Sequence, residues 1–296
     1  MLFAGRSLFG FAVLGFGFVG LAYVDFLNSL QPVPAWLPAY AMLAALNGVA
    51  LTAAGLAILT GRKVRPAALA VALFFAACIV FLHVPSAFTQ PALLRSPWWI
   101  RTFESVALIG GAATLAALGG SPTPEPWIRG GRRAFGLALP VFGILHLVYG
   151  EGTASLVPPW YPAPLFWAYF TGVAQIVGGL AIAFGVWPRL AAALAGLMYG
   201  SWGVTLHVPR VWCQLWGPCD FLDVPGGFDA ARGGITSMFV AFGMCGAAWL
   251  VAGGFARAGG GKSGGPARQS DGPAQPVRAA LRPDSGGHPD RTDPAR

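Results

Sequence analysis

Two histidines stand in matching contexts, His83 in Leu82-His83-Val84-Pro85 and His207 in Leu206-His207-Val208-Pro209. Each comes at the end of a long apolar run. Two imidazoles at equal depth could bind a quinone head group or a metal ion. The alternative is local, because the dipole of a helix favours His at its C-terminus and a following proline ends the helix. A bis-His haem is disfavoured, since its axial ligands usually face each other inside a helical core.

A third histidine, His146, lies five residues before Glu151 at the end of another apolar run. Ionisable groups in such segments are candidates for function. The matching position earlier in the chain holds Gly20, so we expect any site in the second half, in an apolar cleft near His146, Glu151, His207 and Trp160. The alternative is a stabilising pair between His146 and Glu151 at the membrane interface.

Arg101 and Glu104 are three residues apart at the start of a further apolar run. Side chains at this spacing share one face of a helix. A carboxylate also suits the N-terminal end of a helix. We therefore expect an interfacial salt bridge between them rather than a functional site.

The four cysteines divide into two pairs by position. Cys78 and Cys245 lie within apolar runs, where cysteine usually packs as a small side chain. Cys213 and Cys219 share a polar loop, and we expect a structural disulfide between them on the outer side of a membrane. A redox-cycling pair is the less favoured alternative, because the spacing is not Cys-x-x-Cys.

No recognised metal or catalytic motif accompanies these residues. Asp220, Asp223 and Asp229 fit no standard calcium loop, so no metal site is expected. The sequence has no phosphate-binding glycine loop, nucleophile elbow, zinc-protease motif or Cys-x-x-Cys-His. We therefore expect no autonomous hydrolase, kinase or cytochrome c activity, and no cofactor is evident beyond a quinone.

The elements that must position these residues are membrane helices. The chain of 296 residues is 55% hydrophobic and 10% charged, and its mean hydropathy is +0.62. Soluble domains carry about 25% charged residues, so the bilayer is the expected environment. Apolar runs near the 20 residues that a spanning helix needs predict eight transmembrane helices: 7–24, 39–59, 66–82, 103–118, 134–149, 165–186, 190–206 and 235–252.

The basic residues indicate an orientation for these spans. Lys and Arg concentrate at the N-terminus and in the loops after the second, fourth and sixth spans, whereas acidic residues dominate the other loops. Basic loops stay in the cytoplasm, so both termini are predicted to be cytoplasmic. The net charge of +8 reflects this bias and a mildly basic tail, and no nucleic-acid partner is expected. The Gly-, Pro- and Ser-rich residues 257–296 predict a disordered tail.

The two halves of the chain repeat each other. Residues 33–85 align without a gap to residues 157–209, with 23 identities in 53 positions. This indicates a tandem duplication of a four-helix unit. The predicted domains are a first unit at 1–129, a second unit at 130–256 and the tail at 257–296. Because four spans are an even number, the units are expected to be parallel repeats, forming two four-helix bundles in an all-α integral membrane protein.

Each unit resembles the DoxX family of bacterial membrane proteins. The resemblance rests on the aromatic-acid ends Tyr23-Val24-Asp25 and Tyr149-Gly150-Glu151, the loops Pro34-Ala35-Trp36-Leu37-Pro38 and Pro158-Pro159-Trp160-Tyr161-Pro162, and the two His-Val-Pro motifs. It is closest over 134–209.

The resemblance implies a multi-pass protein of the bacterial inner membrane. It further implies a quinone- or thiol-linked accessory subunit without autonomous catalysis, acting with a membrane or periplasmic redox partner. A scaffold or assembly factor is the alternative, and a small-molecule transporter ranks third because the spans hold few polar residues to line a path.

Overall fold

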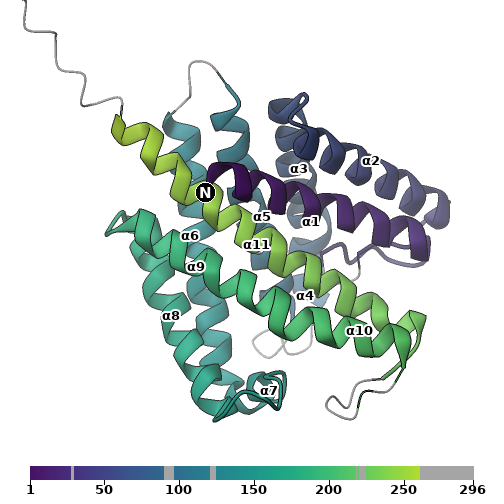
Figure 1. Ribbon diagram of the computed structural model, residues 1–296. Helices are drawn as coiled ribbons and strands as arrows, with labels where there is room; N and C mark the ends of the chain where they lie inside the picture. Colours follow the sequence, from purple (N-terminus) through teal and green to yellow (C-terminus); the bar gives the residue numbers. More distant parts are fainter. Residues whose placement is uncertain (28–29, 90–96, 121–124, 218, 220–224, 261–296) are drawn as a thin grey trace, which may run out of the picture.

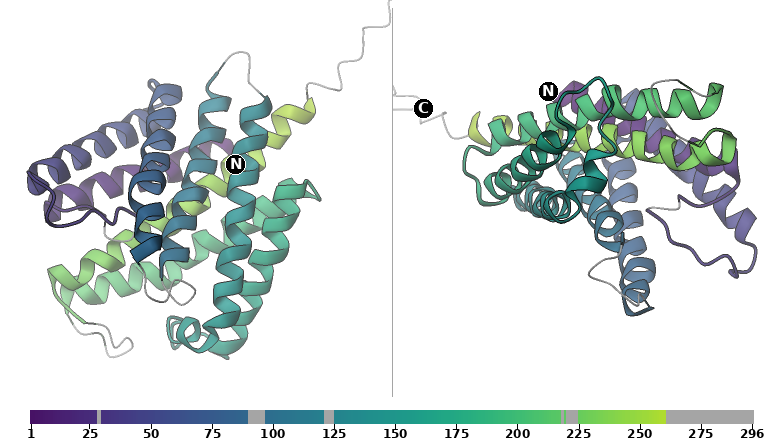
Figure 2. Two further views of the ribbon diagram at one scale, coloured as in Figure 1. Left: turned by 180° about the vertical axis from the view of Figure 1, so that it is seen from behind. Right: turned by 90° about the horizontal axis from the view of Figure 1, so that it is seen from below.

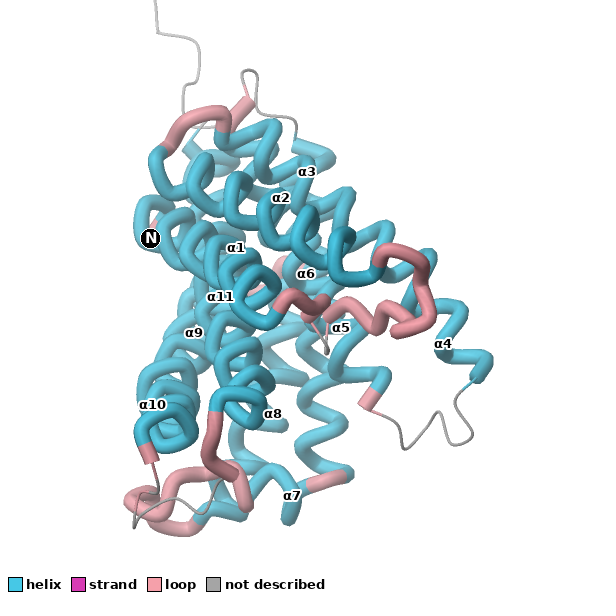
Figure 3. The backbone as a smooth tube through the Cα atoms, turned by 90° about the vertical axis from the view of Figure 1, so that its right-hand side faces the viewer, coloured by secondary structure: helices cyan, strands magenta, loops and turns pink. Residues whose placement is uncertain are grey.

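The computed structural model describes residues 1–27, 30–89, 97–120, 125–217, 219 and 225–260, and Figure 3 shows helices joined by loops. In chain order these are α1 (Leu2–Tyr23), α2 (Tyr40–Thr60), α3 (Val64–Cys78), η1 (Ile79–His83), α4 (Val84–Thr89), α5 (Trp98–Leu118), α6 (Glu125–Val148), α7 (Gly150–Ala154), α8 (Pro164–Phe184), α9 (Pro188–Trp202), η3 (Gly203–His207), α10 (Val208–Trp216) and α11 (Phe228–Gly260). The predicted all-α class is confirmed.

Seven helices within the described residues are long and apolar enough to cross a membrane. They are α1, α2, α5, α6, α8, α11 over Phe228–Phe255, and the continuous rod that α3, η1 and α4 form over Val64–Thr89. The eighth predicted span, 190–206, is helical as α9 and η3 but is not among these seven. Polar residues such as Ser201 and Thr205 make it less apolar than the others. The chain is therefore a multi-span membrane protein.

The third helix of each unit continues past its proline. The expectation that Pro85 and Pro209 end these helices is wrong, since α4 runs to Thr89 and α10 to Trp216. A proline inside a helix has no N–H to donate, and its ring clashes with the preceding turn. Both rods meet this constraint with a five-residue π-helical turn, η1 and η3, just before the proline. The wider turn lets the helix continue.

The fourth helix of each unit packs on the first helix of the other. α1 packs against α2 of its own unit and against α11 of the second unit, whereas α6 packs against α8 and against α5 of the first unit. α5 and α11 also contact each other. Figures 1 and 2 show α1 lying along α11 near the middle, with α2 and α3 on one side and α8 and α9 on the other. The two units are thus interlocked.

Glycines allow the closest of these helix contacts. A Cβ at Gly246 of α11 would lie 2.4 Å from the Phe9 backbone nitrogen, and a Cβ at Gly110 of α5 would lie 2.7 Å from that of Phe135. Small residues at such crossings let helix backbones approach closely. Phe9 and Phe135 are equivalent in the repeat, 126 residues apart. The packing therefore makes Gly110 and Gly246 equivalent.

The described part of α11 extends past the end of the second predicted domain. The predicted tail begins at residue 257, whereas α11 continues to Gly260. The remaining residues of that predicted tail, 261–296, lie outside the described residues.

Candidate functional site

The second unit encloses a cavity of about 960 Å³. We call it the second-unit cavity. Side chains of α6, α7, α8, α9, η3, α11 and the loop between α7 and α8 line it, together with Ile100 and Glu104 of α5. Most of the lining is apolar. The cavity contains both His146 and His207 in its wall, which is where sequence reasoning placed a site.

A chain of hydrogen bonds crosses the wall of this cavity. The Tyr199 hydroxyl donates to Gln175 Oε1 at 2.9 Å, and Gln175 Nε2 lies 3.5 Å from both ring nitrogens of His146. His146 Nδ1 lies 2.8 Å from the Phe142 carbonyl oxygen. A carbonyl can only accept, so Nδ1 carries the proton and Nε2 is left as an acceptor. The polar groups are thus ordered from α9 through α8 to α6.

Packing holds His146 in place. Its ring stacks on Trp202 with centroids 5.7 Å apart and an interplanar angle of 14°. The Cβ of His146 lies close to Gly172. A Cβ added to Gly172 would be only 2.9 Å from it. The absence of a side chain at Gly172 therefore lets α8 approach α6 and bring Gln175 toward the imidazole.

His207 and His83 have different surroundings despite their equivalent positions. His207 lines the second-unit cavity, and its Nδ1 is buried with no hydrogen-bond partner among the described residues. His83 is 1% exposed, and its Nε2 lies 3.1 Å from the Leu30 carbonyl oxygen. His83 is not in the cavity wall, so the structure does not bring the two histidines into one site. His83 instead anchors the loop after α1.

Glu151 and Trp160 lie outside the cavity wall. Glu151 is exposed on α7, and Trp160 is 48% exposed in the loop that follows. Within the described residues no ion pair joins His146 to Glu151. The neighbours Tyr149 and Thr153 line the cavity instead. Of the five predicted ligand-binding residues, the structure brings His146 and His207 to the cavity.

Glu104 is a cavity residue that sequence reasoning missed. The expected salt bridge with Arg101 is wrong, because the two ion pairs among the described residues are Arg129–Glu125 and Arg232–Asp25. Glu104 is half-buried and faces the second-unit cavity, although it belongs to the first unit. A carboxyl group inside a spanning helix is itself the signal that could have identified it.

The first unit has no counterpart of this polar network. An offset of 126 residues matches His146 with Gly20. An offset of 124 residues matches Gln175 with Leu51, Tyr199 with Phe75 and Trp202 with Cys78. Phe75 is fully buried, and its ring packs edge-on to that of Phe16 at 6.3 Å. At the positions of Gln175 and Tyr199 the first unit therefore holds apolar side chains that pack in its core.

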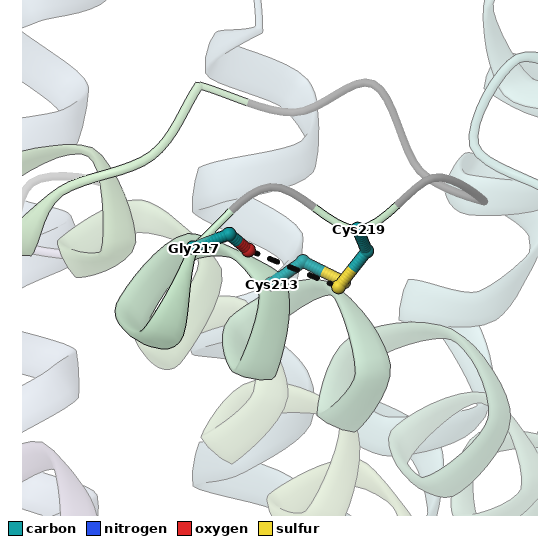
Figure 4. The surroundings of a disulfide bond; sticks show 3 residues. All are labelled: Cys213, Gly217 and Cys219. Carbon is teal, nitrogen blue, oxygen red and sulfur yellow. Dashed lines mark hydrogen bonds between the residues drawn. A yellow bond between two sulfur atoms is a disulfide. The ribbon is translucent and has the colours of Figure 1, made fainter.

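Cys213 and Cys219 are joined by a disulfide, with their Cα atoms 5.5 Å apart. Figure 4 shows the bond between α10 and the loop that follows, where Cys219 Sγ lies 3.9 Å from the Gly217 carbonyl oxygen. Cys78 and Cys245 are free and buried. In the described ranges no cluster of three His, Cys, Asp or Glu side chains could hold a metal ion. Asp220 and Asp223 lie outside those ranges.

The fold and the second-unit cavity define a multi-span α-helical membrane protein that holds a mostly apolar cavity with a few polar groups in its wall. The model of the DoxX family matches residues 129–208. The chain therefore carries a DoxX domain in its second unit, and the resemblance seen in the sequence is confirmed there. No curated protein and no solved structure matches the chain. The matched residues include the whole His146–Gln175–Tyr199 network and His207, whereas Glu104 lies outside them.

Proposed function

We propose that this DoxX protein binds a lipid-soluble quinone-type molecule in the second-unit cavity and serves as an accessory subunit of a redox system, without autonomous catalysis. Its partner would be a membrane or periplasmic redox protein. The protein would lie in a bacterial inner membrane with both termini in the cytoplasm. The observation that carries the proposal is one cavity that combines an apolar wall with the His146–Gln175–Tyr199 network.

The size of the cavity suits such a ligand. Small-molecule sites usually measure about 300–1,000 Å³ and are mostly apolar with few polar groups. Cavity-lining residues recur along α9 and η3 from Trp187 to His207. At 1.5 Å of rise per residue this stretch covers about 30 Å, close to the hydrocarbon thickness of a bilayer. An aromatic head with a long isoprenoid-like tail fits these dimensions.

The rim of the cavity offers access from lipid. Val177 on α8 and Leu190 and Leu194 on α9 line the cavity and are also 54–61% exposed. Exposed aliphatic side chains at the depth of the bilayer face acyl chains rather than water. A membrane-dissolved molecule can therefore enter between α8 and α9 without crossing a polar surface.

The proposal is tested by titrating the purified protein in nanodiscs with a decyl-tailed benzoquinone and following tryptophan fluorescence, which reports on Trp202 and Trp167 in the wall. We expect saturable quenching. Tyr199→Phe should weaken binding several-fold because it removes the hydroxyl that orients Gln175. The matched control is Tyr23→Phe, which removes a hydroxyl bonded to the Phe228 carbonyl outside the cavity.

Two results would overturn the proposal. One is the absence of saturable quenching in the unmodified protein. The other is equal affinity in the Tyr199→Phe and Tyr23→Phe variants, since the network would then play no part in binding.

A further inference from the structure

Five of the hydroxyl groups that line the second-unit cavity already donate to protein acceptors. Tyr199 donates to Gln175, Tyr161 to Thr205, Thr205 to the Ser201 carbonyl, Ser201 to the Met198 carbonyl and Thr171 to the Trp167 carbonyl. A hydroxyl that donates its proton still has an oxygen able to accept. These five groups, which lie on α8, α9, η3 and the loop before α8, therefore meet a ligand mainly as acceptors.

His146 adds a further acceptor. Its Nδ1 proton points to the Phe142 carbonyl at 2.8 Å, and this fixes Nε2 as a lone pair. The nearest protein donor to Nε2 is Gln175 Nε2 at 3.5 Å, which is at the outer limit of a hydrogen bond. A ligand hydroxyl could approach Nε2 more closely than this amide does.

Glu104 is the strongest acceptor in the wall. Among the described residues no hydrogen bond or ion pair reaches its carboxyl group. As a carboxylate the group only accepts hydrogen bonds, and the protonated form keeps an acceptor oxygen beside its one donor. Leaving such a group without a partner in a membrane interior is costly, so a ligand that donates a hydrogen bond would relieve this cost.

Because Glu104 belongs to the first unit, a cavity with this acid requires both units of the duplicated chain. The equivalence of Gly110 and Gly246 places Val240 of α11, six residues before Gly246, as the counterpart of Glu104. Val240 is 6% exposed and lines the same cavity. The first unit thus supplies an acid to a cavity that the second unit mostly builds.

We propose that the second-unit cavity prefers a ligand with a hydrogen-bond-donating head, the hydroxyl-bearing quinol form of a lipid-soluble quinone, and that Glu104 of the first unit accepts the hydrogen bond. The inference rests on the proposed function, because it names which redox form of that ligand class the site selects. It requires no electron transfer within this chain. We expect one molecule per chain, since the first unit holds Leu51 and Phe75 in place of Gln175 and Tyr199.

The test compares three short-tailed probes in nanodiscs under anaerobic conditions: a decyl benzoquinol, its oxidised benzoquinone, and the dimethyl ether of the quinol. The unmodified protein should bind the quinol about tenfold tighter than the ether, because hydrogen bonds to carboxylates are among the strong ones. It should also prefer the quinol to the quinone. Glu104→Gln replaces a carboxylate acceptor by the weaker, neutral amide oxygen, so it should weaken quinol binding about tenfold. It should leave quinone binding within about twofold, because the new NH₂ group can donate to a quinone carbonyl.

Glu125→Gln is the matched control, since Glu125 forms an exposed ion pair with Arg129 at the start of α6. It should alter neither affinity. If Glu104→Gln unfolds, Glu104→Asp keeps the carboxyl group and should retain a preference for the quinol. Saturable quinone binding without preference for the quinol, or equal quinol affinities in Glu104→Gln and Glu125→Gln, would overturn this inference and leave the proposed function standing. Failure of both redox forms to bind would overturn the proposed function itself.

Discussion

Gln175 and Tyr199 can be replaced by the residues that the first unit holds at the equivalent positions, Leu51 and Phe75. Gln175 is 1% exposed and Tyr199 is 5% exposed, and they share one hydrogen bond of 2.9 Å. Gln175→Leu alone leaves the Tyr199 hydroxyl without its acceptor, and Tyr199→Phe alone leaves the Gln175 carbonyl oxygen without its donor. A buried polar group that loses its partner costs about 1–3 kcal/mol.

The double variant Gln175→Leu, Tyr199→Phe removes both partners together. Replacing a hydrogen-bonded pair by apolar groups of similar shape is nearly neutral, and the first unit shows that Leu51 and Phe75 fit this fold in buried positions. Each single variant should lose about 1–2 kcal/mol, and the double variant about 0–1 kcal/mol. The coupling free energy is then about 1 kcal/mol or more, within the range measured for hydrogen bonds between membrane helices.

The assay is equilibrium unfolding in mixed SDS and lipid micelles, with helical circular dichroism as the signal. Quinone titration of the same samples should show that the double variant has lost binding although it is stable. A double variant destabilised by the sum of the two single effects would refute the reasoning, because the hydroxyl and the amide would then be acting independently.

Three further substitutions test other features of the fold. Gly246→Ala should destabilise the protein by more than about 2 kcal/mol in the same unfolding assay, because the added Cβ would meet the α1 backbone and overpacking forces backbone shifts. Gly130→Ala on α6 is the control, since nothing lies within 4 Å of a Cβ there, and a loss as large as that of Gly246→Ala would contradict the packing argument. Cys213→Ala should lower stability by about 2 kcal/mol through loss of the disulfide, and reductant should lower the unmodified protein to the same level. Arg232→Gln should destabilise the protein more than Arg129→Gln does. The Asp25–Arg232 pair is less exposed than the Glu125–Arg129 pair, and exposed ion pairs contribute little to stability. Equal losses of stability in the two variants would contradict this reasoning.

The sequence predicts the helical class, most spans and the half of the chain that holds the cavity. These properties depend on local composition, on span length and on the comparison of repeated positions such as His146 with Gly20. The rods through Pro85 and Pro209 were not predicted, because a proline is compatible both with the end of a helix and with a π-helical turn that lets the helix continue.

Glu104 shows why the remainder of the site was not predicted. Its spacing from Arg101 suits a salt bridge on one helix face, and nothing local excludes that pairing. The direction of Glu104 depends on the rotation of α5, which is set where Gly110 meets α6 of the other unit. A contact between residues of different units cannot be read from either unit alone.

The most direct test of the central claim is photolabelling with a short-tailed azidoquinone in nanodiscs, followed by mapping of the labelled peptides. The repeat supplies an internal control, because α2 and α3 are the first-unit counterparts of α8 and α9. The account predicts labelling of α8 and α9, competition by unlabelled quinol, and no competable labelling of α2 and α3. Equal labelling of the two helix pairs, or labelling that unlabelled ligand does not displace, would contradict it.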